Sequence, residues 1–79
     1  MRILDDESNK KLDNVSFFLT EQEAIQLHSD LQELITNRKK HHAHISSDDY
    51  QKEITICIYD EKNLSGFHDR AKTLIREDK

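Results

Sequence analysis

The sequence predicts a small α+β protein with the element order β-β-α-β-β-α, in which one antiparallel sheet carries two helices packed on one face. Two segments in the second half of the chain alternate between apolar and polar residues, which is the period of a β-strand. Two other segments repeat apolar residues every three or four positions, as amphipathic helices do. The chain has no proline and its connections are short, so antiparallel strands with helices on one side are expected.

Two strands are expected before the first helix. Residues 2–5 predict a short strand, and a polar turn follows it. The run from residue 15 to residue 19 alternates and predicts a second strand whose odd-numbered apolar residues point inward. Phe18 then lies on the opposite face of the sheet, because successive side chains alternate across a strand.

A capping box predicts where the first helix begins. Thr20 and Glu23 have the spacing at which each side chain satisfies a free backbone donor at a helix start. The apolar residues that follow recur at helical spacing as far as about Asn37. We interpret this stripe as core, and its members are Ala24, Leu27, Leu31 and Leu34, flanked by Ile25 and Ile35.

A β-hairpin is expected after this helix. Its strands are His41–Ile45 and Glu53–Tyr59, and the Ser- and Asp-rich residues 46–49 have the composition of a turn. The apolar residues that would point into the core are Ala43, Ile45, Ile54, Ile56 and Ile58. For these residues to share one face, each odd-numbered residue of one strand must pair with an even-numbered residue of the other, or the reverse. His44 then opposes Glu53 or Thr55, and His42 opposes Thr55 or Cys57.

A second amphipathic helix is expected from about residue 64 to residue 76. Phe67, Ala71, Leu74 and Ile75 give it an apolar face. Gly66, the only glycine, falls in the first turn of this predicted helix.

Composition narrows the classes of function. With 79 residues the chain fits one domain, 1–79, whose core would contribute roughly 3–5 kcal/mol net, so self-association is expected. The net charge of -4 argues against nucleic-acid binding. No apolar run approaches the roughly 20 residues that span a bilayer, and no signal peptide is evident, so we expect a cytoplasmic protein that is not membrane-bound. A lone cysteine, Cys57, fits a reducing compartment.

The sheet face opposite the helices is the expected binding surface. Its mixed aromatic and polar character is typical of surfaces that bury against another protein. We therefore predict a small protein-interaction or regulatory module, a homodimer or a protein that binds a partner protein. The residues of this predicted face are Phe18, His42, His44, Thr55 and Tyr59, and Tyr50 adds a further aromatic.

A metal or small-ligand site is the alternative hypothesis for the same face. His42 and His44 are two positions apart on a strand, so their rings point the same way. Glu53 or Cys57 from the neighbouring strand would complete a zinc site. No other cofactor is expected, and no arrangement of residues typical of a catalytic site is present, so an enzyme is not predicted.

The capped helix, the His-rich segment His41–Ile45 and the isoleucine-rich segment Glu53–Asp60 follow one another in this chain. In this arrangement the chain resembles small bacterial proteins of uncharacterised function, over about residues 17 to 76. The resemblance implies a cytosolic α+β protein that acts as a regulator or as a toxin-neutralising partner, and it identifies no catalytic residue.

Overall fold

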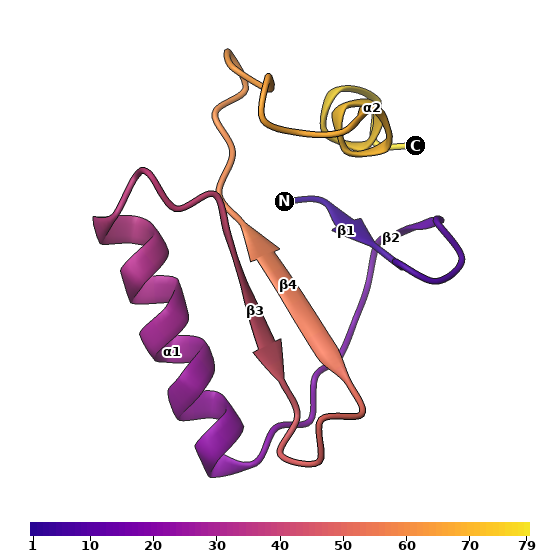
Figure 1. The fold of residues 1–79 in the computed structure, drawn as a ribbon. Coiled ribbons are helices and arrows are strands. Elements are labelled where there is room, and N and C mark those ends of the chain that lie inside the picture. Colours follow the sequence, from indigo (N-terminus) through magenta and orange to yellow (C-terminus); the bar gives the residue numbers. More distant parts are fainter. The chain divides into compact units, whose positions relative to one another are not determined.

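A computed structural model describes residues 1–79 and confirms the α+β class (Figure 1). Its elements are β1 (Ile3–Leu4), β2 (Lys11–Leu12), α1 (Glu21–Thr36), β3 (His42–Ser46), β4 (Glu53–Cys57) and α2 (Asp69–Glu77). The strands form two antiparallel sheets, β1-β2 and β3-β4, where the sequence predicted a single sheet. Neither helix has the length and apolar character needed to cross a lipid bilayer.

The residues group into two compact units. The central unit comprises residues 18–58 and holds α1 and the β3–β4 hairpin. The terminal unit comprises residues 1–17 and 59–79 and holds β1, β2 and α2.

The core of the central unit lies where α1 packs against β3. Leu34 of α1 is 2% exposed, and Ala43 and Ile45 of β3 are also buried. Ile54 and Ile56 of β4 point to the same side of the hairpin and are half-buried. The predicted alternation of the hairpin is therefore confirmed within β3 and β4, because their apolar members share one side and their polar members the other. Ile58, which was also predicted to point into the core, lies beyond the end of β4 and is 39% exposed.

In the terminal unit a tight turn joins the two short strands. Ile3 pairs with Leu12, and the backbone N–H of Asp5 donates to the carbonyl of Lys10 (2.9 Å). The Asp5 carboxylate also accepts from the backbone and side chain of the turn, and these hydrogen bonds lower the pKa of Asp5. Asn9 completes the turn with a left-handed backbone (φ 63°).

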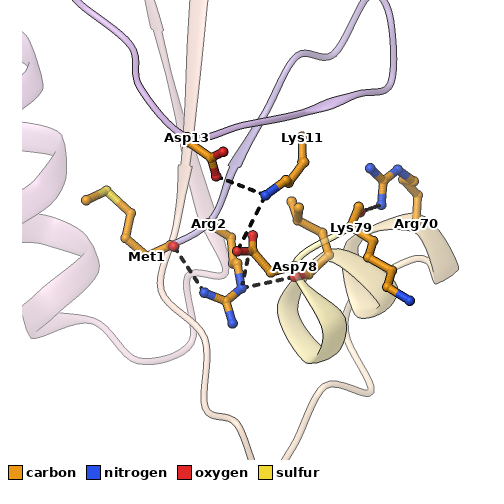
Figure 2. A network of polar contacts seen from close by, with 8 residues as sticks. Met1, Arg2, Lys11, Asp13, Arg70, Asp78 and Lys79 are labelled. Atoms are coloured by element: carbon orange, nitrogen blue, oxygen red, sulfur yellow. Dashed lines mark hydrogen bonds and ion pairs between the residues drawn. The ribbon is translucent and has the colours of Figure 1, made fainter.

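Basic side chains join the ends of α2 to the N-terminal strands (Figure 2). Nε of Arg2 donates to the carbonyl of Leu74 (3.0 Å), in the last turns of α2, and lies 3.8 Å from the carboxylate of Asp78. Nε of Arg70 donates to the carbonyl of Asn9 (3.1 Å). Arg2 thereby adds a side-chain donor to a carbonyl that also accepts from the backbone N–H of Asp78 (2.9 Å).

The second predicted strand, residues 15–19, is wrong. Residues 14–20 form neither strand nor helix, because no neighbouring segment offers them a hydrogen-bond ladder. Val15, Phe17 and Leu19, which the alternation placed inward, are 45%, 56% and 38% exposed. The second strand of the chain is β2, whose first residue, Lys11, belongs to the polar turn that the sequence predicted.

The second helix begins five residues later than the pattern predicted. The side chains of Asp60 and Asn63 accept from backbone N–H groups two residues ahead, which holds residues 60–67 in turns. The helix starts after His68, whose Nδ1 accepts from the N–H of Ala71 (3.2 Å). Gly66 consequently lies in a turn before α2 and not in the first turn of the helix.

Candidate functional site

The outer face of the hairpin is the side of β3 and β4 that points away from α1. All of its strand residues are exposed, namely His42, His44, Ser46, Glu53, Thr55 and Cys57. The register pairs His42 with Cys57 and His44 with Thr55, as one of the two predicted registers required. The hairpin therefore brings together both histidines, the glutamate and the cysteine that the sequence singled out.

His44 is held in place by two neighbours on β4. Its Nδ1 lies 2.7 Å from Oε1 of Glu53 and 2.9 Å from Oγ1 of Thr55. A carboxylate only accepts hydrogen bonds, so the contact with Glu53 requires a proton on Nδ1. The side chains of His44 and Glu53 are half exposed, so water screens the pair and its energetic contribution is small.

His42 stands beside His44 on the same face. The two rings meet edge to face with their centroids 4.8 Å apart. No group of three or more His, Cys, Asp or Glu side chains is arranged to hold a metal ion. The outer face of the hairpin thus carries two adjacent imidazoles, one of them oriented by a carboxylate.

One end of the central unit is built from the start of α1 and the β3–β4 turn (Figure 1). Thr20 and Glu23 form the predicted capping box: Oγ1 of Thr20 accepts from the N–H of Glu23 (3.1 Å), and Oε1 of Glu23 accepts from the N–H of Thr20 (2.8 Å). Asp48 of the turn joins both residues. Its N–H donates to Oε2 of Glu23 (2.8 Å), and its Oδ2 accepts from Oγ1 of Thr20 (2.8 Å).

These four hydrogen bonds define what we call the cap–turn bracket, formed by Thr20, Glu23 and Asp48. The N–H groups of Thr20 and Asp48 stabilise the ionised carboxylate of Glu23 and lower its pKa. The capping box was evident from the sequence, but its link to Asp48 was not, because the spacing of local residues says nothing about a turn 25 residues further along.

Two aromatic side chains flank the cap–turn bracket. Phe18, two residues before Thr20, is 94% exposed, and Tyr50, two residues after Asp48, is 85% exposed. They are the most exposed aromatic residues in the chain. We call this end of the central unit the aromatic end, defined by Phe18 and Tyr50.

Tyr50 has a left-handed backbone, with φ at 59°. This region is unfavourable for a residue with a bulky side chain and is usually taken by glycine or asparagine. Local hydrogen bonds hold the turn around it: Oγ of Ser47 (3.2 Å) and Oδ1 of Asp49 (3.1 Å) both accept from the N–H of Gln51. Donation from Ser47 and Gln51 lowers the pKa of Asp49.

The remaining member of the predicted face, Tyr59, lies elsewhere. β4 ends at Cys57, and Tyr59 belongs to the terminal unit, where it is half-buried. Phe18 also lies outside the hairpin ladder, since the predicted strand that would have carried it does not form. Of the five predicted face residues, His42, His44 and Thr55 share the outer face of the hairpin.

The helix stripe interpreted as core is only partly buried. Leu34 is buried and Leu27 is half-buried, but Leu31 is 43% exposed. Ile25 and Ile35, which flank the stripe, are 55% and 54% exposed. The width of the stripe was the sequence signal for this exposure. Its residues occupy about half of the helix surface, and one two-stranded hairpin covers less than that.

Comparisons with known proteins place the chain in no family. A scan against protein-family models and searches of curated proteins and of solved structures all returned no match.

Proposed function

We propose that this chain is a small protein-interaction module that binds a partner protein through its aromatic end and the adjoining outer face of the hairpin. The observation that carries the proposal is the placement of Phe18 and Tyr50. Both side chains are exposed almost completely. Both lie two residues from the cap–turn bracket, whose hydrogen bonds hold the helix start to the hairpin turn.

Exposed aromatic side chains on a fixed backbone are the usual anchors of protein interfaces. An aromatic ring supplies a large contact area and few rotatable bonds, so its ordering on binding costs little entropy. The left-handed backbone at Tyr50 supports the same conclusion, because such strain often accompanies a functional role. Within the chain, the Tyr50 side chain makes no hydrogen bond that would account for it.

The outer face of the hairpin complements this anchor with polar groups. His42, His44 and Thr55 offer donors and acceptors, and Glu53 fixes the orientation of His44. The sequence predicted self-association through this face. Its strands contribute no large apolar side chain to the face, so recognition of a polar partner surface fits it better than burial against a second copy.

A photo-crosslinking amino acid placed at position 50 of the full chain tests this proposal in a lysate of the source cells. We expect a discrete crosslinked product that excess wild-type protein competes away and that the Phe18→Ala competitor removes less well. The matched control places the crosslinker at Lys62, which lies in an exposed turn of the terminal unit. Equal products at positions 50 and 62, or equal competition by wild type and Phe18→Ala, contradict the proposal.

The second candidate function is metal or small-ligand binding by His42 and His44. One observation favours it: a carboxylate on Nδ1 of a histidine is the arrangement that commonly orients Nε2 toward a metal ion. Cys57 lies opposite His42 in the ladder. Zinc would then raise the thermal midpoint of the wild type and not of a His42→Ala, His44→Ala double variant. Equal midpoints with zinc and with a chelator would exclude this candidate.

A further inference from the structure

A row of apolar side chains on α1 is left exposed by the fold of the central unit. Ile25, Leu31 and Ile35 are each about half exposed, with His28 between them. These four residues are three, three and four positions apart, so each side chain neighbours the next along one side of the helix. We call this row, defined by Ile25, His28, Leu31 and Ile35, the α1 flank.

The two ends of α1 carry opposite and unused charges. Glu21 lies in the first turn, and Arg38 and Lys39 follow the last turn. None of these three side chains forms an ion pair or a hydrogen bond within the chain. By contrast, Lys40 is already paired with Glu33 (3.3 Å).

An antiparallel pair of α1 helices would bury the apolar row of each copy and also place the opposite charges of the two copies next to each other. A two-fold axis near the level of residue 30 sets Ile25 of one copy against Ile35 of the second copy, and His28 against Leu31. The same axis brings Glu21 to the end of the other helix that carries Arg38 and Lys39. A parallel pair would instead place like charges together at both ends, which is destabilising.

From these features we propose that the α1 flank is the surface on which a second copy of this chain docks, with the two α1 helices antiparallel. The surface is distinct from the aromatic end, so a dimer leaves the proposed partner-binding residues Phe18 and Tyr50 outside this contact.

The size of the surface sets the strength of the association. A helix of 16 residues is about 24 Å long, and a strip about 10 Å wide along it has a projected area of roughly 240 Å². This is well below the approximately 800 Å² that each partner buries in a standard stable complex. The dimer is therefore expected to be weak and to be populated only at high protein concentration.

Sedimentation equilibrium of the full chain over a wide concentration range tests the proposal. The wild type is expected to show a monomer–dimer equilibrium, and Leu31→Lys is expected to weaken it at least tenfold. Gln26→Lys is the matched control, because it adds the same charge to α1 beside Asp30, away from the α1 flank. Circular dichroism checks that each variant retains its helices.

Charge reversal tests the antiparallel arrangement with side chains that form no ion pair or hydrogen bond within the chain. Glu21→Lys is expected to weaken the dimer by about three- to tenfold, since two exposed ion pairs are lost and repulsion replaces them. Adding Arg38→Glu to that variant is expected to restore association, and raised salt should diminish both effects. A wild type that stays monomeric, a Leu31→Lys variant that associates normally, or a double reversal that fails to restore the dimer would each overturn the proposal.

Discussion

Removing the hydroxyl of Thr20 should destabilise the central unit by more than an ordinary surface substitution does. In Thr20→Ala the N–H of Glu23 loses its cap, which costs about 1 kcal/mol at a typical helix start. The bond from Thr20 to Asp48 is lost as well, and an exposed hydrogen bond of this kind contributes about 0.5 kcal/mol or somewhat more. The total is about 1.5 kcal/mol, or a fall in Tm of about 6–12 °C for a chain of this size.

Urea unfolding followed by circular dichroism measures this difference directly. Thr20→Ser keeps the hydroxyl and should remain within about 0.5 kcal/mol of the wild type. Thr36→Ala is the matched control, because the Thr36 hydroxyl donates back to the carbonyl of Gln32 within α1 and such a bond adds little stability. If Thr20→Ala and Thr36→Ala unfold at the same urea concentration, the cap–turn bracket does not stabilise the protein as argued.

Three further predictions concern other contacts. The lowered pKa of Glu23 means that its ionised carboxylate stabilises the folded chain at neutral pH, and that this contribution is lost as the pH falls through the native pKa, below about 4.5. Glu23→Gln should therefore lose less stability than the wild type when the pH is lowered. Stability–pH curves of the two proteins that run parallel would contradict this. Arg2→Ala should lower stability by about 0.5 kcal/mol in chemical denaturation, because the carbonyl of Leu74 loses its side-chain donor but still accepts from the N–H of Asp78, whereas Arg38→Ala should have almost no effect. Tyr50→Gly should raise the free energy of unfolding by roughly 1 kcal/mol through relief of the left-handed backbone, and an unchanged or lower value would argue against strain at this position.

The parts of the fold that local patterns determine were predictable. Thr20 and Glu23 located the start of α1 because a capping box depends only on residues three positions apart. The alternation of Ala43 and Ile45 with the histidines fixed both the inward face of the hairpin and its two permitted registers. In each case the structural determinant lies within a few residues of the element itself.

The parts that depend on distant partners were not predictable. Phe17 belongs to a run that alternates as a strand does, but a strand also needs a neighbour, and none pairs with it. The same limit affected the candidate site. His42, His44 and Thr55 came together as expected, while Phe18 and Tyr50 could be related only through the contact between a helix cap and a turn.

The cap–turn bracket also couples the fraying of the α1 start to the fraying of the β3–β4 turn. The last residue before a helix and the tip of a hairpin are both places where a chain usually frays on its own. Here a single carboxylate, that of Glu23, accepts from the N–H groups of Thr20 and Asp48, so unwinding of the first turn of α1 would break one of the hydrogen bonds that hold the hairpin turn. Tyr50, two residues after Asp48, therefore lies in a turn that is hydrogen-bonded to the start of α1, and we expect a partner that immobilises this turn to slow the opening of the helix start.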